Sequence, residues 1–261
     1  MSSLARERNM WRIYALEAKY ELLKMMRLPM YAIPTLAFPL MFYLLFGVAM
    51  GGRSAGPVSM AAYLLATYGA FGVMGVALFG FGVGVAVERG QGWLLFKRAT
   101  PMPTPVYFAG KLAMVLLFAM VLTAALFTLG ATVGKVRMPA GQWAALAGIL
   151  IAGAVPFGAF GLAIGSWAGP NSAPAVVNVV YLPLAFASGM WVPIQALPKI
   201  FQALAPWLPS YHFAQIALGV MGADQGRFSS VESAGVLAAF AAVSLLIAWA
   251  CYRRDEGKTF G

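Results

Sequence analysis

Side chains that could perform chemistry are few in this sequence and lie far apart. The 261 residues include 18 lysines and arginines, eight aspartates and glutamates, one histidine and one cysteine. Catalytic and metal sites need several such groups converging at one place. We therefore expect His212 to be a hydrogen-bonded packing residue, and one cysteine supports neither a disulfide framework nor a cysteine-based metal site. The sequence predicts no catalytic residues and no metal centre.

Two segments bear a superficial likeness to nucleotide-binding motifs. Residues 80–84 read G-F-G-V-G, but the third glycine has the wrong offset and no strand precedes them. Residues 257–259 read G-K-T, as at the end of a phosphate-binding loop, but Tyr252 stands where the first glycine belongs. We expect this chain to bind no cofactor, so that any ATP and Mg²⁺ would be held by a partner polypeptide.

The densest group of charges in the middle of the chain lies in residues 88–105. Three prolines near its end stop any helix before the next apolar segment. From the residues alone, it is either an ordinary basic loop at a membrane surface or a segment that binds a partner. Its charged residues are Glu88, Arg89, Lys97 and Arg98, and its aromatic residues are Trp93 and Phe96.

The composition places these residues in a membrane protein. Hydrophobic residues make up 61% of the chain and charged residues 10%, whereas soluble domains carry about 25% charge. A water-soluble enzyme is thereby excluded. The net charge of +10 is typical of basic loops that face anionic lipid headgroups. We expect an all-α polytopic protein that contacts lipid and binds no nucleic acid.

Uncharged apolar segments predict six transmembrane helices. Lys111 falls inside the third, near one end, where its long side chain is expected to reach the headgroups. Glycines between residues 69 and 84 are expected to permit close helix–helix approach. The turn at 169–174 must divide the uncharged 138–198 stretch. Three expected spans are 28–52, 59–87 and 106–133, and the last is 233–252. The other two lie in the 138–198 stretch, one before the turn at 169–174 and one after it, ending at residue 189.

Two further segments are expected to be helical without crossing the bilayer. Residues 4–27 alternate charged and apolar residues with a helical period, which indicates either a solvated helix or one lying in the membrane interface. The expected apolar side comprises Met10, Trp11, Tyr14, Ala18, Leu22, Met25 and Met26, whereas Arg8, Arg12, Glu17 and Lys19 fall mostly elsewhere.

Residues 191–230 are cut by prolines into pieces too short to span a bilayer. One face of the expected short helix comprises Ile194, Leu197, Ile200, Phe201 and Leu204. A span followed by a broken amphipathic segment indicates a re-entrant or interfacial element.

The order of these motifs resembles the ATP-binding-cassette type-2 permeases, the membrane subunits of bacterial exporters. Residues 188–198 read S-G-M-W-V-P-I-Q-A-L-P and residues 207–212 read W-L-P-S-Y-H. The E-R-G, W-L and R-A-T-P pieces of the 88–105 segment match the loop between spans two and three of that family.

The resemblance implies roles for particular residues. The 88–105 segment would be a cytoplasmic coupling loop that docks on the ATPase, and the N-terminal helix, through Trp11 and Arg12, would also contact it. Residues 191–230 would cap the transport path outside the cell. The implied gate residues are Met190, Trp191, Pro193, Leu197 and Pro198.

The distribution of basic residues predicts the orientation. With the N-terminus in the cytoplasm, 13 lysines and arginines fall on the cytoplasmic side and five on the other. This bias places both termini inside, in a bacterial plasma membrane. The 191–230 segment then lies outside, as the resemblance requires.

The sequence thus favours the permease subunit of an ATP-driven exporter for drug- or lipid-like substrates, paired with a second permease, more readily an identical one, and two ATPase copies. A polysaccharide, glycolipid or ion exporter is the alternative. A membrane-embedded lipid enzyme would need convergent polar groups. A gradient-driven transporter generally needs an ionisable group inside the bilayer, whereas Glu88, Asp224 and Glu232 are expected at borders or in loops.

Overall fold

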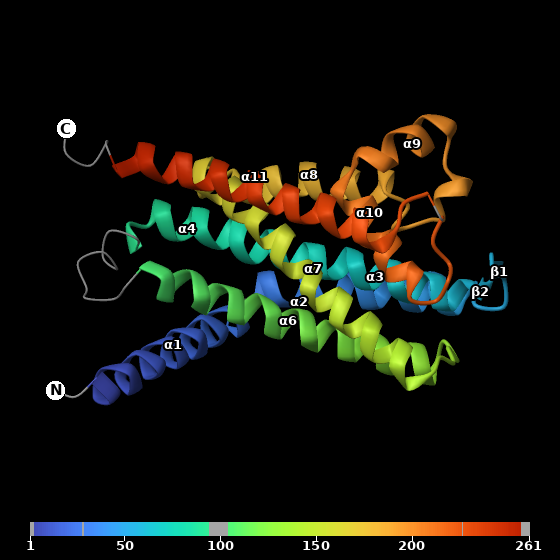
Figure 1. Cartoon of the computed structure of the whole chain (residues 1–261), viewed down its shortest axis with the longest axis horizontal. Coiled ribbons are helices and arrows are strands. Elements are labelled where there is room, and N and C mark those ends of the chain that lie inside the picture. The colour runs from blue at the N-terminus through green and yellow to red at the C-terminus, as the bar shows by residue number, and fades with distance from the viewer. Residues whose placement is uncertain (1–2, 28, 94–103, 226, 257–261) are drawn as a thin grey trace.

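The computed structural model describes residues 3–27, 29–93, 104–225 and 227–256. It is an elongated bundle of helices (Figure 1). The helices are α1 (Ser3–Met26), α2 (Pro29–Phe42), π-helical η1 (Tyr43–Val48), α3 (Met60–Ala77), π-helical η2 (Leu78–Val83), α4 (Gly84–Gly90), α6 (Thr104–Thr132), α7 (Ala140–Trp167), α8 (Ala173–Ala187), 3₁₀-helical η3 (Ile194–Ala196), α9 (Lys199–Leu204), 3₁₀-helical η4 (Ala205–Trp207), α10 (Pro209–Gly219) and α11 (Ser230–Glu256).

Four helical segments are long and apolar enough to cross a membrane: Met60–Gly90, Pro105–Thr132, Ala140–Trp167 and Ser230–Cys251. The other two expected spans are also helical, as α2 with η1 and as α8. Of these, α8 has 15 residues, or about 22 Å at about 1.5 Å per residue, against a hydrocarbon core of about 30 Å. The mostly helical, polytopic architecture is confirmed, with four candidate spans within the residues that the structure describes. Six spans and the re-entrant segment stay predictions.

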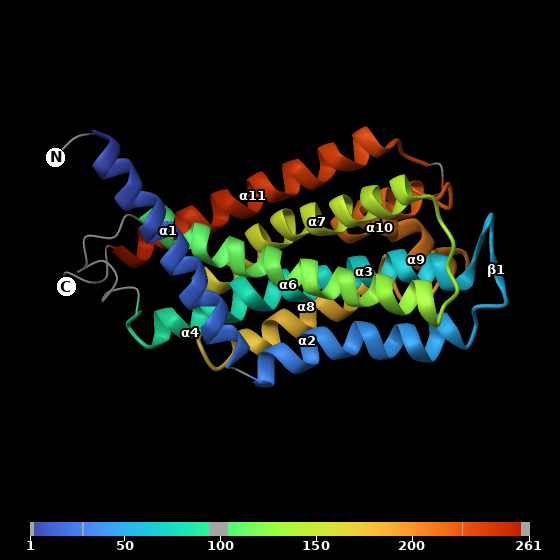
Figure 2. The same cartoon turned by 90° about the horizontal axis from the view of Figure 1, so that it is seen from below.

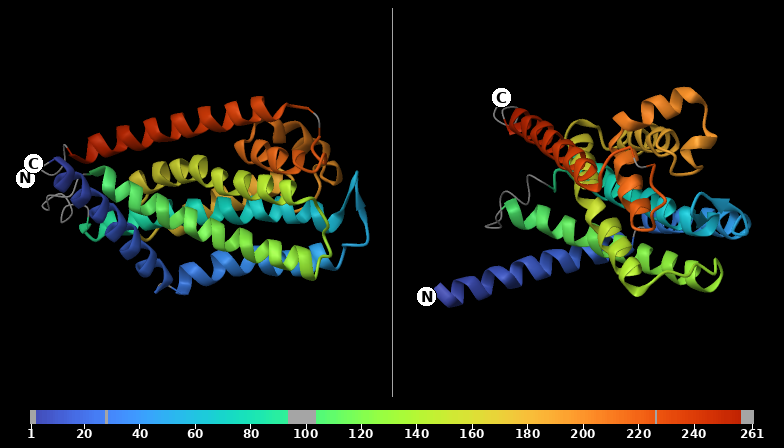
Figure 3. Two further views of the ribbon diagram at one scale, coloured as in Figure 1. Left: turned by 60° about the horizontal axis from the view of Figure 1, so that its bottom comes forward. Right: turned by 45° about the vertical axis from the view of Figure 1, so that its right-hand side comes forward.

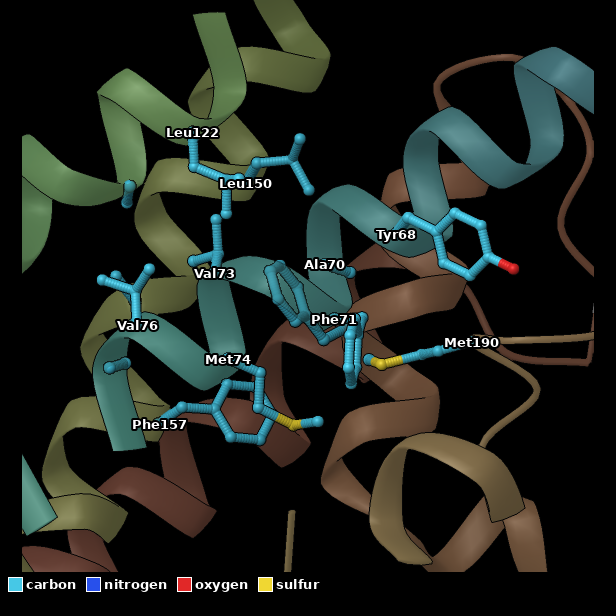
Figure 4. Close-up of a cluster of buried hydrophobic side chains, with 14 of the residues drawn as sticks. Tyr68, Ala70, Phe71, Val73, Met74, Val76, Leu122, Leu150, Phe157 and Met190 are labelled. Carbon is cyan, nitrogen blue, oxygen red and sulfur yellow. The ribbon is translucent and has the colours of Figure 1, made fainter. Parts of the chain in front are cut away.

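Helix α3 forms the centre of the bundle. Every residue from 61 to 77 is buried, which explains why this segment is apolar on all sides rather than amphipathic. Figure 4 shows the cluster around α3, in which Phe71 lies beside Met190 and Met74 beside Phe157.

Glycines allow η2 and α7 to approach closely, as expected for helices packed in lipid. A Cβ atom added at Gly165 would lie 2.7 Å from the carbonyl oxygen of Gly82, and one at Gly161 would lie 3.0 Å from that of Ala77. These contacts are to backbone atoms, which cannot rotate away. Glycine is therefore required at this crossing.

The two ends of the bundle differ. Both chain termini lie at one end, with α1 and the end of α4, and we name it the terminus end (Figures 1 and 2). At the opposite hairpin end, β1 (Ser54–Ala55) pairs antiparallel with β2 (Val58–Ser59). Gly56 has φ +66°, and this left-handed conformation lets Gly56 and Pro57 close a tight hairpin.

Helices α9 and α10 also lie at the hairpin end (Figure 1). Ile194 and Leu197 are buried in a small apolar cluster with Tyr211. Ile200 is 65% exposed and Leu204 49% exposed, because the 3₁₀ turn and Pro198 break the segment into two short helices, which do not share one continuous face. The re-entrant or interfacial placement of this segment stays a prediction.

His212 is buried between α10 and α11, as a hydrogen-bonded packing residue should be. Its Nδ1 lies 3.1 Å from Ser233 Oγ, and its Nε2 lies 3.0 Å from the carbonyl oxygen of Pro206. A carbonyl can only accept, so Nε2 carries the proton and Nδ1 accepts from the serine hydroxyl. The prediction for His212 is confirmed.

Candidate functional site

Helix α1 lies obliquely across the terminus end of the bundle and packs against α6 (Figures 2 and 3). The contact is closest at Gly110. A Cβ atom there would lie 2.7 Å from Glu17 Cγ and 3.4 Å from the backbone nitrogen of Ala18. Glycine in α6 therefore lets the backbone of α1 approach, and this brings the charged residues of α1 onto the first turns of α6.

These residues form a buried ionic cluster that joins three helices. It comprises Glu21 and Lys24 from α1, Glu88 from α4, and Tyr107 and Lys111 from α6. Lys111 Nζ donates to Glu88 Oε1 at 2.9 Å and approaches Glu21 Oε2 at 3.3 Å. Lys24 Nζ donates to both oxygens of Glu21, at 2.8 and 2.7 Å, and also to Glu88. Tyr107 donates its hydroxyl to Glu88 Oε2 at 2.6 Å.

The cluster is deeply buried and its charges balance. Lys111 is 1% exposed, Glu21 4% and Glu88 8%, and two ammonium groups face two carboxylates. Burying an unpaired ion costs several kcal/mol, so each of these charges depends on the others. The ammonium of Lys111 also lies 5.0 Å from the centre of the Tyr107 ring, where a cation is attracted to the aromatic face.

The burial of Lys111 therefore contradicts the expectation that its side chain reaches the headgroups. Two carboxylates within hydrogen-bonding distance replace the water that its ammonium would otherwise seek. Lys24, on α1 outside the spans, is only partly buried. Burial acts to lower the pKa of Lys24, but the carboxylates of Glu88 and Glu21 outweigh it and raise this pKa above the ordinary value.

Arg89, the neighbour of Glu88, fixes α4 to α7. Its guanidinium donates to the carbonyl oxygens of Ser166 and Ala168, the latter at 2.8 Å. These carbonyls lie at the C-terminal end of α7, where cations satisfy the last acceptors and the helix dipole. Glu88 thus anchors the end of α4 to α6, and Arg89 anchors it to α7.

A cavity of about 500 Å³ lies beside the cluster. One wall comes from α1 and the other from η2, α4 and the residues that follow α4. Most of the lining is apolar, and its polar part comes from charged side chains of α1 and α4 and from Gln91. The lining residues are Glu17, Tyr20, Glu21, Lys24, Met25, Phe79, Val83, Gly84, Val87, Glu88, Gln91 and Trp93.

Among the residues expected to contact an ATPase, those that the structure describes fall in two groups. Trp11, Arg12 and Trp93 are exposed at the terminus end, whereas Glu88 and Arg89 are engaged within the chain. Lys97 and Arg98 lie outside the described residues. The coupling role of all these positions stays a prediction.

The apolar side expected for α1 is partly exposed, and its placement in the membrane interface stays a prediction. Trp11 is 76% exposed and Met26 62% exposed. The side of α1 that faces the protein includes Glu17 and Glu21, because Glu17 packs at Gly110 of α6 and Lys111 of α6 donates to Glu21 there. Pairing partners on other helices, rather than hydrophobicity, decide how α1 is turned.

The expected gate residues lie at the hairpin end. Met190 is fully buried, and Trp191 lies between Phe71 and Phe186, with ring centroids at 5.6 and 6.1 Å. Leu197 is buried nearby, and Pro193 and Pro198 immediately precede η3 and α9. The indole nitrogen of Trp191 is buried and has no hydrogen-bond partner among the residues that the structure describes.

Sequence reasoning missed the cluster as a unit. Glu21 lies 90 residues before Lys111 along the chain, and Tyr107 belongs to the same helix as Lys111. One signal was available, because Glu21 and Lys24 stand at the i, i+3 spacing of a helical ion pair. The second signal was that two charged residues, Glu88 and Lys111, stand at the borders of apolar segments.

Comparison with known proteins assigns the fold to a family. The family model described as "ABC-2 type transporter" matches residues 14–221. The chain is also 27% identical over 236 residues to the protein named "Putative transport permease YvfS" of Bacillus subtilis strain 168, covering 90% of this chain and 95% of that protein. The residues that the family model matches include the ionic cluster, the helices from α3 to α8 and the expected gate residues. The chain belongs to the ABC-2 type transporter family.

Proposed function

We propose that this chain is the membrane-spanning, non-catalytic subunit of an ATP-driven exporter. Its substrate is a hydrophobic or amphipathic compound, drug- or lipid-like, carried out of the cytoplasm or the inner leaflet. Membership of the family and the likeness to a transport permease support the transport role. The nearly uncharged spans and the mostly apolar cavity support the substrate class.

Energy comes from a partner. Two copies of a separate ATP-binding-cassette subunit bind ATP and Mg²⁺ and hydrolyse the nucleotide, and a second copy of this chain completes the transport path. The exposed Trp11, Arg12 and Trp93 at the terminus end suit such a docking surface, because aromatic and arginine side chains are enriched at interfaces. Lys97 and Arg98 are proposed to join them.

The observation that carries the proposal is the buried ionic cluster. It connects α1, a helix with an exposed aromatic and basic side, to the ends of two long spans. Separating the paired charges would leave an ion uncompensated in a low-dielectric interior, at a cost of about 3–5 kcal/mol. A force on α1 is therefore transmitted to α4 and α6 instead of being lost by local slippage.

The same geometry bears on a gradient-driven mechanism. Glu88 is a buried carboxylate near the end of a span, which is what such a mechanism would use. However, it accepts hydrogen bonds from Lys24, Lys111 and Tyr107 together. A carboxylate held by two ammonium groups is stabilised in its charged form, which favours a structural link over a proton carrier.

The proposed placement in the membrane follows the basic residues. The terminus end faces the cytoplasm of a bacterial cell and the hairpin end faces outward, where Met190, Trp191, Pro193, Leu197 and Pro198 form the gate. Movement of α4 reaches this gate through α3, which is continuous with η2 and α4 and packs on the cluster containing Met190 (Figure 4).

Co-purification tests the partnership. The tagged chain is expressed with an ATP-binding-cassette ATPase encoded beside it, extracted in mild detergent and analysed by size exclusion and native mass spectrometry. We expect a complex of two permeases and two ATPases that hydrolyses ATP. A permease that purifies without any ATPase, at expression levels where both proteins are stable, would contradict the proposal.

A further inference from the structure

We propose that η2 and Pro156 of α7 together form a hinge, about which the terminus end changes its angle to the core around α3. The hinge is a property of this chain alone, and its use in transport rests on the proposed export function. It lets a force that enters at α1 tilt the ends of two spans while the centre of the bundle stays packed.

The second span changes its hydrogen-bond pattern at η2. At the end of α3, the N–H of Leu78 donates to the carbonyl oxygen of Met74, four residues earlier, as in an α-helix. At the end of η2, the N–H of Gly84 donates to the carbonyl oxygen of Phe79, five residues earlier. The π-helical turn thus contains one extra residue, and such turns bend helices and are frequent at functional sites. The second span therefore bends most easily at η2.

The helix that packs against η2 is weakened at nearly the same level. Pro156 is buried inside α7, and because proline has no N–H, one hydrogen bond of the helix is missing there. Two residues later, a Cβ atom on Gly158 would lie 3.2 Å from the ring of Phe81 in η2. Arg89 ties the end of α7 to α4. The terminus-end parts of α4 and α7 therefore bend together.

The surroundings of η2 leave room for this motion. On one side lies the cavity of about 500 Å³, which Phe79, Val83 and Gly84 line, so these residues can shift toward α1. On the other side, η2 and α7 touch through backbone atoms at the glycines of α7. Helix α3 differs, because every residue from 61 to 77 is buried and a closely packed helix resists bending.

The contacts of α4 determine what moves with it. Glu88 and Arg89 hold α4 to α6 and α7, so these helix ends tilt as a unit. Helix α6 continues without a break and exposes Met120 and Val121, so it tilts as a whole. Because η2 itself is helical, an axial push on α4 still reaches α3 while the angle between them changes.

Hydrogen–deuterium exchange tests the hinge without a partner, on the full chain in phosphatidylcholine nanodiscs. Residues 80–82 of η2 are compared with residues 69–71 of α3, after correction for the intrinsic rate of each residue type. Both runs are buried and contain glycine and phenylalanine. We expect exchange in η2 to be at least about tenfold faster, because bending opens its hydrogen bonds locally. Equal protection of the two runs would overturn the proposal.

Deletion of Gly80 removes the hinge. Loss of the extra residue lets η2 become α-helical while Glu88 keeps its direction toward Lys111. We expect the variant to fold, with the exchange of this segment slowed to that of α3. The matched control is deletion of Gly69 in the regular helix α3, which turns the following residues by about 100° and should prevent folding.

The motion itself is measured in the complex with the ATPase. Spin labels are attached at Lys19→Cys in α1 and Ser54→Cys in β1, both exposed positions, in a chain that carries Cys251→Ser. We expect ATP binding to shift the distance between the labels, and we expect no shift after deletion of Gly80. An unmoved distance in a complex that hydrolyses ATP, or the same shift after the deletion, would overturn the proposal.

Pro156→Ala keeps the test decisive if the deletion does not fold. It restores the missing N–H of α7 and is expected to reduce the ATP-dependent shift, and an undiminished shift would contradict its part in the hinge. Pro174→Ala, in the first turn of α8 where proline fits a helix, should leave the shift unchanged. Equal protection of η2 and α3 in an active complex would refute this inference alone. Faster exchange at η2 in a permease that recruits no ATPase would refute the proposed function and leave the hinge standing.

Discussion

Lys111 and Glu88 meet in the interior of the protein, with 2.9 Å between Nζ and Oε1, although they belong to different spans. Both are almost inaccessible to solvent. Their contact fixes the end of α4 to the beginning of α6, and Lys24 adds α1 to the same point through Glu88. The terminus end therefore behaves as one unit of three helices.

Removal of one charge from this unit should destabilise the protein strongly. Lys111→Met leaves the carboxylates of Glu21 and Glu88 facing a single ammonium. We expect a loss of about 3–5 kcal/mol in the free energy of unfolding, measured by denaturant titration in mixed micelles. Lys199→Met, at an exposed position, should change it by less than about 0.5 kcal/mol.

A double substitution separates charge balance from side-chain shape. Lys111→Met combined with Glu88→Gln again leaves one carboxylate and one ammonium. We expect the double variant to be more stable than Lys111→Met alone, with a coupling energy in the range of about 0.5–3 kcal/mol seen for contacting residues. Strictly additive effects would show that the two residues do not interact.

The crossing of η2 and α7 offers a pair of matched glycines. Gly165→Ala places a methyl group 2.7 Å from a backbone carbonyl oxygen, whereas Gly148 on the same helix has no atom within 4 Å of the added Cβ. Alanine is favoured over glycine in a helix by about 1 kcal/mol. We expect Gly148→Ala to be neutral or stabilising and Gly165→Ala to lower the melting temperature, both followed by tryptophan fluorescence.

The position of α1 can be tested through its partner. Gly110→Leu places a bulky side chain where Glu17 Cγ and the backbone of α1 now lie, so α1 must move away from α6. We expect the variant to insert into membranes but to retain much less ATPase during purification. Gly148→Leu, on α7, should retain it fully. Full retention in both variants would show that docking does not depend on the position of α1.

The pKa of Lys24 gives a dependence on pH. Because this pKa is raised in the folded state, the contribution of Lys24 to stability is fully present below the ordinary lysine value of about 10.5 and is lost as the pH rises through the folded-state value. The difference in unfolding free energy between wild type and Lys24→Met should therefore be constant from pH 7 to about 10. It should shrink only above that range, and a decline near neutrality would contradict this assignment.

Hydropathy alone was sufficient to locate the long apolar helices. Long uncharged segments must form helices in lipid because every backbone polar group has to be satisfied within the segment. The span predicted at 59–87 corresponds to Met60–Gly90, and that at 106–133 to Pro105–Thr132. The short length of α8 was not predicted, since turns on both sides of it shorten the regular structure.

The ionic cluster could not be predicted to the same degree. Hydropathy treats Lys111 as a residue that seeks water, whereas the fold supplies it with Glu88 and Glu21 from two other helices. Which charges pair depends on how α1 crosses α6, and that crossing depends on the small size of Gly110. The rotation of α1 and the burial of Glu88 follow from this long-range contact.

Reconstituted transport tests the central claim, that force from a separate ATPase enters through the cytoplasmic face of this chain. Proteoliposomes contain either the permease with its ATPase or the permease alone, and uptake of a labelled hydrophobic cation is followed in inside-out vesicles. The account predicts uptake that requires ATP and the ATPase, with no response to an imposed proton gradient. Uptake by the permease alone in response to that gradient, unchanged by ATP, would contradict it.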